Sequence, residues 1–390
     1  MFFTQDSMLP ENQAPLIITA APFAPQWLKS DYPEDIAITW DEQVQKAVDC
    51  YNAGATCLHV HVRDPKTGHV SKNFKEYSYF IGRLREAVPK MILQIGGSIS
   101  FAPEPGQEAH WQGYDTRHML TEIDPKPDQI TIVIGSVQMN ILPLTTPDDV
   151  KGTQLENPAM QKAYQNMVAD ATPEFYIEHL KRLRQHQIQP FFQLANVHNL
   201  EEIENLIRQG VYMGPLNHAL VAIGGGVGAS RNPFDFMEWV RRSPHGSVPS
   251  IESLWRTVAP YAAIAIALGI NLRVGIEDNL WRTKGVRMTT VEQIEQVVHM
   301  ANLLERKVAT GEEARQILKI GVWYNSVEET LANLALPPNR KGGQLGFIVK
   351  DTDGRLSEPA LSSCMHPIPW KELHEKVTGT KVTGTKVKVA

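Results

Sequence analysis

Two histidines separated by a single residue are the clearest chemical feature of the sequence. Residues 55–62 are apolar and β-branched enough to predict a buried strand, and Asp64 and Pro65 end it. Because side chains alternate along a strand, we expect His59 and His61 on the same face. Two neighbouring imidazoles at the end of a strand form half of a metal site. The alternative is a pair of hydrogen-bonded histidines in the core.

A second charged motif supplies a candidate third metal ligand. Residues 271–276 have the pattern of a strand, so Arg273 and Glu277 are expected on one face. Charged side chains that point into a protein interior are costly unless they are paired or bind a metal. Two histidines and one glutamate leave a coordination position open, which is typical of catalytic zinc. The alternative is an internal ion pair between Arg273 and Glu277 without a metal.

Apolar runs alternate with amphipathic helical stretches along most of the chain. We expect eight strands, at residues 15–21, 55–62, 91–97, 129–135, 189–195, 219–223, 247–254 and 271–276, with helices between them, among them 40–53, 72–87, 173–187, 200–208, 257–268, 290–307 and 311–318. This alternation predicts an α/β fold, a (β/α)8 TIM barrel. The alternative is an open doubly wound sheet, but its GxGxxG fingerprint does not follow the first strand. The glycines at 224–228 do not fit that spacing and are more typical of a flexible loop.

Closure of the barrel would bring the two motifs together. In a closed eight-stranded barrel the last strand lies beside the first, and the second strand is next. Functional sites of this fold lie at the carboxyl ends of the strands, where His59, His61 and Glu277 are all expected. The sequence therefore predicts a metal site of three protein ligands at this end.

Two segments lie outside the regular alternation of strands and helices. Residues 148–170 form a polar insertion after the fourth strand, which we interpret as a lid or an interface element. We expect a catalytic barrel domain at 1–337 and a C-terminal extension at 338–390, with a hairpin near 347–361 and a low-complexity tail at 376–390.

Composition excludes several classes of protein. The chain has 390 residues, 42% of them hydrophobic, and a net charge of only -5, which argues against nucleic acid or an anionic membrane as a partner. The 3 cysteines form no CxxC pair and no disulfide framework. We see neither a signal peptide nor a membrane-spanning segment. These features favour a cytoplasmic protein.

The motifs carry a family resemblance over most of residues 15–320. Three stretches resemble the β-keto acid cleavage enzymes: Gly54-Ala55-x-x-x-His59-x-His61-x-Arg63-Asp64-Pro65, Gly96-Gly97-Ser98, and Arg273-x-Gly275-x-Glu277-Asp278-Asn279. Members of that family are zinc-dependent TIM barrels, in several cases homo-oligomers. They exchange acyl groups between a β-keto acid and acetyl-CoA, and they release acetoacetate and a new CoA ester.

The resemblance assigns roles to individual residues of this chain. It implies that His59, His61 and Glu277 bind Zn2+ and that Arg273 and Asp278 form the catalytic pair. Zinc would polarise the keto carbonyl as a Lewis acid, with acetyl-CoA as co-substrate. Asp278, held by Arg273, would act as the base that generates a carbon nucleophile from the acetyl thioester. A tetramer is the expected assembly. Iron, cobalt or manganese also suits a site of two histidines and one carboxylate.

Four further residues are candidates for substrate binding. The resemblance makes Ser98 the substrate-binding serine, and the amides of Gly96 and Gly97 are expected to hold a carboxylate or oxyanion with it. Ser136 follows the fourth strand, and Gln193 lies in the fifth. The family commonly has an acidic residue at the place of Gln193, which in one branch receives a substrate ammonium. A neutral Gln193 therefore predicts a preference for β-keto acids with uncharged tails.

Two other functions are compatible with parts of the pattern. Metal-dependent hydrolases of the amidohydrolase type also use an HxH motif in a barrel, but on the first strand, with further histidines after the fifth and sixth. Here His198 follows the fifth strand, whereas His218 precedes the sixth. A non-catalytic barrel that stores metal or senses a ligand would leave Arg273 and Asp278 without a purpose.

Overall fold

A closed barrel of parallel strands forms the centre of the molecule. The computed structural model describes residues 1–103, 107–140, 142–222, 232–254, 258–283 and 285–339, and the structural statements below concern these residues. The barrel order is β1-β10-β9-β8-β7-β4-β3-β2. The strands are β1 (Ile18–Ala20), β2 (Cys57–Val60), β3 (Ile92–Ile95), β4 (Gln129–Ile134), β7 (Gln189–Leu194), β8 (Asn217–Ala222), β9 (Val248–Ser253) and β10 (Asn271–Val274). This closure confirms the predicted (β/α)8 barrel and excludes the open sheet.

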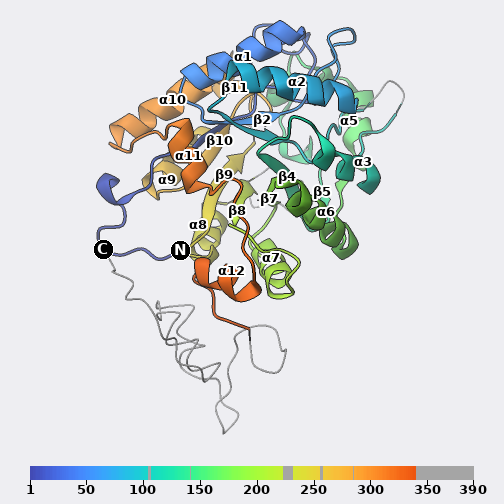
Figure 1. Ribbon diagram of the computed structural model, residues 1–390. Helices are drawn as coiled ribbons and strands as arrows, with labels where there is room; N and C mark the ends of the chain where they lie inside the picture. Colours follow the sequence, from blue (N-terminus) through green and yellow to red (C-terminus); the bar gives the residue numbers. More distant parts are fainter. Residues whose placement is uncertain (104–106, 141, 223–231, 255–257, 284, 340–390) are drawn as a thin grey trace, which may run out of the picture.

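Helices surround the barrel and bury its outer face (Figure 1). Leu58 and Val60 of β2, for example, pack in one hydrophobic core with Ala47 and Phe80 of the covering helices. Strands of a parallel barrel are buried on both faces, which explains their continuous apolar character. The helices are α1 (Trp40–Asn52), α2 (Phe74–Ala87), α3 (Tyr114–Met119), α6 (Pro173–His186), α7 (Asn199–Arg208), α8 (Pro233–Arg242), α9 (Val258–Ala267), α10 (Thr290–Leu303), α11 (Gly311–Ile317) and α12 (Val327–Asn333).

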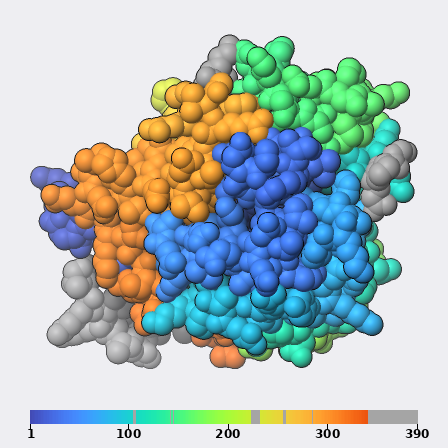
Figure 2. Space-filling model, turned by 90° about the horizontal axis from the view of Figure 1, so that it is seen from above, coloured from blue at the N-terminus to red at the C-terminus, as the bar shows by residue number. Residues whose placement is uncertain are grey.

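Local sequence signals fix where these helices begin. Thr39 caps α1 through a reciprocal capping box with Glu42, and Thr289 caps α10 in the same way with Glu292. Such a box satisfies amide groups that would otherwise lack partners at the helix start. α1, α2 and α10 lie side by side on the face seen from above, in the blue, light-blue and orange segments of Figure 2.

The insertion after the fourth strand is larger than the polar stretch 148–170. It fills the chain between β4 and α6, and it contains the two-stranded sheet β5 (Val137–Gln138) and β6 (Val168–Ala169) and the short helices α4 (Pro147–Val150) and α5 (Pro158–Tyr164). Its apolar residues form a second hydrophobic cluster with the loops that follow β1 and β10. Trp281 Nε1 donates a hydrogen bond of 3.0 Å to the carbonyl oxygen of Asp149 in the insertion. The insertion is therefore packed onto the carboxyl end of the barrel, and Figure 2 shows its green segment against the blue one.

Several predictions fall outside the described residues. The glycine run 224–228, the hairpin near 347–361 and the tail 376–390 all lie there. The division into domains at 1–337 and 338–390 stays a prediction. No helix in the described part of the chain is long and apolar enough to cross a membrane.

Candidate active site

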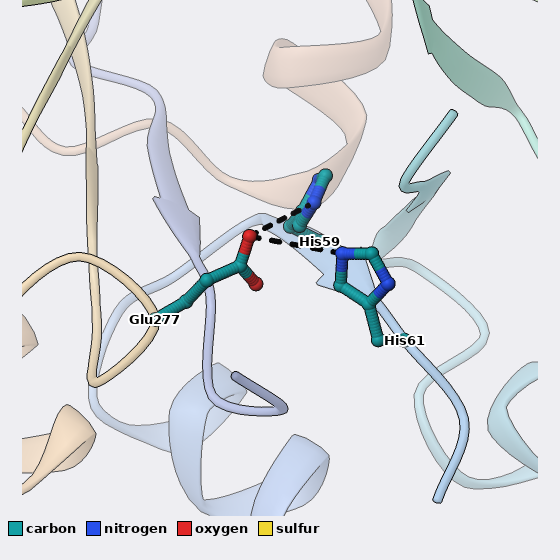
Figure 3. Close-up of side chains that lie close together, drawn as sticks. All are labelled: His59, His61 and Glu277. Atoms are coloured by element: carbon teal, nitrogen blue, oxygen red, sulfur yellow. Dashed lines mark ion pairs between the residues drawn. The ribbon is translucent and has the colours of Figure 1, made fainter. Parts of the chain in front are cut away.

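The structure brings the three predicted metal ligands together at the carboxyl end of the barrel (Figure 3). Glu277 Oε1 lies 3.5 Å from His59 Nε2 and 3.7 Å from His61 Nε2. The candidate ligand atoms of the group all lie within 4.8 Å of one another, and all three side chains are buried. The same nitrogen of each imidazole faces the carboxylate, as a shared ion would require.

A chain of amide side chains fixes the orientation of His59. Its Nδ1 lies 2.9 Å from Gln94 Oε1. Gln94 Nε2 donates to Gln129 Oε1, and Gln129 Nε2 donates to Gln189 Oε1. Because the amide nitrogen of Gln94 is occupied, its oxygen must face His59, so His59 Nδ1 carries the hydrogen. The lone pair is then on Nε2, which points at Glu277, and this is the arrangement that a metal-binding histidine needs.

The backbone fixes the orientation of His61. Its Nδ1 lies 2.7 Å from the carbonyl oxygen of Ile99, which also accepts from the hydroxyl of Tyr77. Ile99 has a φ of 62°, a left-handed conformation that is rare for a β-branched residue. Gly96 leaves room for the ring, since a Cβ there would lie 2.3 Å from His61 Cε1.

Electrostatics prepares the three residues for a cation. Burial lowers the pKa of His59 to about 3, so this imidazole is neutral at ordinary pH. Burial alone would raise the pKa of Glu277, but the charge of Arg273 opposes this rise most strongly, and that pKa lies well below its usual range. Glu277 Oε2 is buried and has no hydrogen-bond partner in the described residues. The neutral imidazole of His59, the ionised carboxylate of Glu277 and its unsatisfied oxygen fit a divalent metal ion.

Arg273 links the candidate metal ligands to the rest of the site. Its guanidinium donates to both oxygens of Asp278, at 2.9 and 2.5 Å, and to Glu277 Oε1 at 3.1 Å. The Arg273–Glu277 ion pair, which was the alternative to a metal site, is thus present together with the cluster of candidate ligands. Arg273 Nη1 makes no hydrogen bond within the described residues. Burial raises the pKa of Asp278 although Arg273 opposes this rise, which suits a group that takes up a proton.

A cavity opens above these groups, with about 1270 Å3 of space including its mouth. Residues of the insertion form much of its apolar wall, among them Met139, Leu142, Leu155, Tyr164 and Met167. The predicted residues His59, His61, Gly97, Ser98, Gln193, Arg273, Glu277 and Asp278 all line it. Ser136 does not line the cavity; its side chain is exposed beside β5.

The glycines after β3 differ from the expectation. The amide of Gly96 donates to the carbonyl of Val60, and the amide of Gly97 donates to Thr131 Oγ1 at 2.8 Å. Neither amide is therefore free to bind a substrate oxygen. Gly97 instead permits close packing, since a Cβ there would lie 1.9 Å from the Thr131 carbonyl. Ser98 remains the polar side chain that this loop brings to the cavity.

A carboxyl group that the sequence reasoning missed completes the polar wall. Glu252 of β9 is buried and lines the cavity. Its Oε2 accepts from Gln193 Nε2 at 2.8 Å and lies 3.6 Å from Arg273 Nη1. Burial, together with the nearby carboxylate of Asp278, raises the pKa of Glu252 to about 7. The cavity wall at Gln193 therefore includes a carboxyl group, which the prediction from the neutral Gln193 alone did not consider.

Comparison with known families identifies the chain. The family model of the beta-keto acid cleavage enzyme matches residues 15–320. The chain belongs to this family. The match spans every strand of the barrel and both metal-ligand motifs, so it agrees with the resemblance seen in the motifs.

Curated relatives are similar to this chain over nearly their whole length. A 3-keto-5-aminohexanoate cleavage enzyme of Acetoanaerobium sticklandii is 26% identical over 78% of this chain and 98% of its own. A 3-dehydrocarnitine:acetyl-CoA trimethylamine transferase of Rhizobium meliloti is 24% identical, over 73% and 90%. A 3,5-dioxohexanoate:acetyl-CoA acetone transferase of Paraburkholderia graminis is 25% identical, over 78% and 96%. Relatives of this family are thus named as cleavage enzymes and acetyl-CoA transferases.

Among solved structures, the complex of ObcA with oxaloacetate resembles the fold. It has a TM-score of 0.53 and 16% sequence identity, and the match covers 74% of this chain and 68% of that one. This similarity concerns the barrel architecture.

The amidohydrolase alternative lacks support in the site. The HxH motif lies at the second strand, β2, as predicted. His198 is exposed, and His218 is buried on β8 with Ser247 as its hydrogen-bond partner. Neither belongs to the cluster of candidate metal ligands.

Proposed function

We propose that this chain is a metal-dependent β-keto acid cleavage enzyme, which converts a β-keto acid and acetyl-CoA into acetoacetate and a new acyl-CoA. The observation that carries the proposal is the joint position of the His59–His61–Glu277 group and the Arg273–Asp278 pair in one cavity. Family membership and the acetyl-CoA transferase names of relatives support the same reaction.

The three candidate ligands would hold one divalent ion, with zinc favoured by the nitrogen and oxygen donors. When bound, the ion would supply Lewis acidity to the oxygens of the keto acid. Iron, cobalt or manganese would suit the same donors. The hydrogen bonds from Gln94 and Ile99 pre-orient both imidazoles.

The products decide which carbon acts as the nucleophile. Acetoacetate forms only if C2 of the keto acid attacks the thioester carbonyl. The nucleophile is therefore the keto acid, and not the acetyl thioester that the sequence analysis expected. Asp278 takes a proton from C2, a C–C bond forms, and CoA thiolate leaves. The thiolate then adds to the 3-oxo carbon, the C2–C3 bond breaks, and C2 recovers the proton from Asp278. Arg273 holds Asp278 in place for both transfers.

Two further polar groups would bind substrate. The Ser98 hydroxyl lies in the cavity, where it can donate to the substrate carboxylate or to the oxygen that develops charge. Arg273 Nη1 makes no hydrogen bond to any described residue and can do the same. These contacts orient the keto acid, and the apolar wall of the insertion excludes water from the thioester.

A substrate screen tests the proposal. The zinc-loaded enzyme is incubated with acetyl-CoA and a panel of β-keto acids, and acetoacetate and acyl-CoA are measured. We expect equal amounts of both products from at least one acid, and a loss of about 10²–10⁴-fold in kcat for D278N. Release of free CoA and acetate without acetoacetate would show hydrolysis and contradict the proposal.

A further inference from the structure

Four buried side chains form one row across the wall of the barrel. His59 is the register partner of Gln94, Gln94 of Gln129, and Gln129 of Gln189, on the neighbouring strands β2, β3, β4 and β7. These residues are at most 2% exposed, and hydrogen bonds join each side chain to the next. The row therefore connects a candidate metal ligand to a strand three places away.

The tilt of the strands makes this row a path along the barrel. In a closed barrel the strands are tilted, so register partners lie at different positions along their strands. Gln189 and Gln129 are the first residues of β7 and β4, whereas Gln94 and His59 are the third of four residues in β3 and β2. The row thus begins at the amino end of the barrel and rises toward the candidate metal ligands. Gln129 and Gln189 do not line the cavity.

Backbone carbonyls fix the direction of the row where it begins. Gln189 Nε2 donates to the carbonyl oxygens of Leu318 and Lys319, at 3.1 and 3.0 Å, directly after α11. Leu318 belongs to a hydrophobic cluster with residues at the starts of β1, β2 and β3, so this segment is packed onto the amino end of the barrel. A carbonyl oxygen can only accept a hydrogen bond. The nitrogen of Gln189 must therefore face α11, and its oxygen must face Gln129.

Each amide passes this direction to the next one. Gln129 donates to Gln189, so the oxygen of Gln129 accepts from Gln94. Gln94 Oε1 is then the atom that accepts from His59 Nδ1. Reversal of a single amide would place two oxygens or two NH2 groups face to face in the core, which is costly. The position of the hydrogen on His59 is thus determined by the main chain after α11.

Glu277 favours the opposite tautomer of His59. Its Oε1 lies 3.5 Å from His59 Nε2, where the carboxylate would attract a hydrogen in the metal-free protein. A hydrogen on Nε2 would occupy the lone pair that a metal ion needs. If Gln94 were free to turn, its NH2 group could donate to Nδ1 and permit this tautomer. The row prevents that turn.

We propose that Gln129 and Gln189 are positioning residues for the metal site, although they lie outside the cavity. The main chain after α11 sets the direction of the amide row, and the row keeps the hydrogen of His59 on Nδ1 against the attraction of Glu277. The inference rests on the proposed function in one respect, that His59 is a metal ligand. A change at the amino end of the barrel should then alter metal affinity at the carboxyl end.

The tautomer can be measured in the metal-free full chain. Nitrogen NMR of labelled histidine, at a pH where imidazole is neutral, distinguishes a hydrogen on Nδ1 from one on Nε2, and H59A identifies the signal of His59. We expect the hydrogen on Nδ1 in the wild type and mainly on Nε2 in Q129M and Q189M, because methionine interrupts the row at similar volume. Competition with a chelator should show zinc binding weakened about 10–100-fold in both variants.

Asn217 provides a matched control at the same end of the barrel. It is equally buried, and its Nδ2 donates to Gln189 Oε1 and to the Leu318 carbonyl, but it is a branch and does not lie between α11 and His59. In N217L the nitrogen of Gln189 still faces α11. The tautomer and the zinc affinity should therefore stay as in the wild type, although two buried hydrogen bonds are lost. General destabilisation would instead weaken zinc binding in all three variants alike.

A carboxylate at position 94 should replace the row. Both oxygens of a carboxylate accept, so its orientation needs no neighbour. The double variant Q94E/Q129M should return the hydrogen of His59 to Nδ1 and recover the zinc binding that Q129M loses. A loss caused by disturbed packing at position 129 would persist in the double variant.

The outcomes separate this inference from the proposed reaction. A hydrogen on Nε2 of His59 in the wild type would overturn the inference, and this result requires no variant to fold. A hydrogen that stays on Nδ1 in Q129M and Q189M, or an equal loss of zinc affinity in N217L, would overturn it as well. No substrate enters these measurements, so a failure to release acetoacetate would refute the proposed reaction alone. Absence of zinc binding in the wild type would refute the metal site, while the tautomer still decides on the row.

Discussion

Each candidate metal ligand is held by a group behind it. Gln94 and the Ile99 carbonyl occupy the Nδ1 atoms of His59 and His61, and Arg273 occupies one oxygen of Glu277. Each histidine therefore presents its Nε2 atom without further rotation of the ring. In Glu277 the bonded atom is Oε1, which also faces both imidazoles, and Oε2 has no hydrogen-bond partner within the described residues. Such outer contacts commonly change metal affinity by about 10–100-fold when they are removed.

Removing a ligand should remove the metal but not the fold. We expect H59A and E277Q each to lose about one equivalent of bound zinc, because two protein ligands do not retain the ion. Metal analysis after dialysis measures this, and circular dichroism checks that the barrel is intact. H198A is the matched control, since His198 is exposed and lies outside the cluster. Full zinc occupancy in either variant would exclude that residue as a ligand.

The residues of the site differ in how well sequence predicts them. His59, His61 and Glu277 follow from strand alternation and barrel closure, which both depend only on the order of the elements. Glu252 was not found because it lies in 247–254, where apolar periodicity is weak. The signal that was available is a charged residue inside a strand. Ser136 was wrongly expected in the cavity. Its position directly after a strand does not determine the direction of its side chain, which is exposed.

At the scale of elements, long apolar runs predict the strands correctly. The segments that connect the strands are predicted less well. All eight barrel strands overlap their predicted ranges, whereas the sequence analysis did not predict α3, α8 or α12. For α8 a signal was present, since Asn232 and Pro233 are typical of a helix start. The insertion reads as polar because its apolar residues are scattered among polar ones. Only the fold shows that these residues gather against the loops after β1 and β10.

One buried carboxylate connects the insertion to the barrel. Asp31, 2% exposed, accepts from the amide of Gln154 at 2.7 Å and from the amide of Leu28 at 2.6 Å. In D31A both donors lose their acceptor, at a cost of about 1–3 kcal/mol each. We expect hydrogen exchange across 147–170 to accelerate at least tenfold, while the strands stay protected.

The conservative variant provides the control for this prediction. Asn at position 31 retains one acceptor oxygen, so D31N should accelerate exchange less than D31A. Wild-type exchange rates in D31A would show that the insertion is held by its apolar contacts alone. The cluster around Trp27 and Trp281 would then be the next target.

At the scale of the whole molecule, the fold buries histidines in several places. His59 lies at the site, His179 on α6 and His218 on β8, and all three are buried. Burial lowers the pKa of His59 and His218 to about 3 each and holds the pKa of His179 well below its usual range. The folded protein therefore keeps these imidazoles neutral at pH values where an unfolded chain would protonate them. We therefore expect acid to lower the free energy of unfolding of the barrel through these histidines.

The direction of this effect follows from proton linkage. An unfolded histidine has a pKa of about 6.5, so below that pH the unfolded state binds more protons than the folded state. Each such histidine lowers the free energy of unfolding by up to about 1.4 kcal/mol per pH unit as the pH falls. For His218 this loss runs from near its unfolded pKa down to about pH 3, where the folded protein also becomes protonated.

His218 allows a test away from the metal ligands. Its Nε2 lies 3.1 Å from Ser247 Oγ, and the hydroxyl donates to the Pro244 carbonyl, so Nε2 carries the hydrogen. H218Q preserves a donor to Ser247 but cannot bind a proton. Urea unfolding between pH 6 and 4 should therefore show a shallower decline of stability for H218Q than for wild type, by up to about 1.4 kcal/mol per pH unit. H186Q, at an exposed position, should keep the wild-type slope. An unchanged slope in H218Q would mean that His218 becomes protonated in the folded barrel, and that solvent reaches the space between β8 and α8.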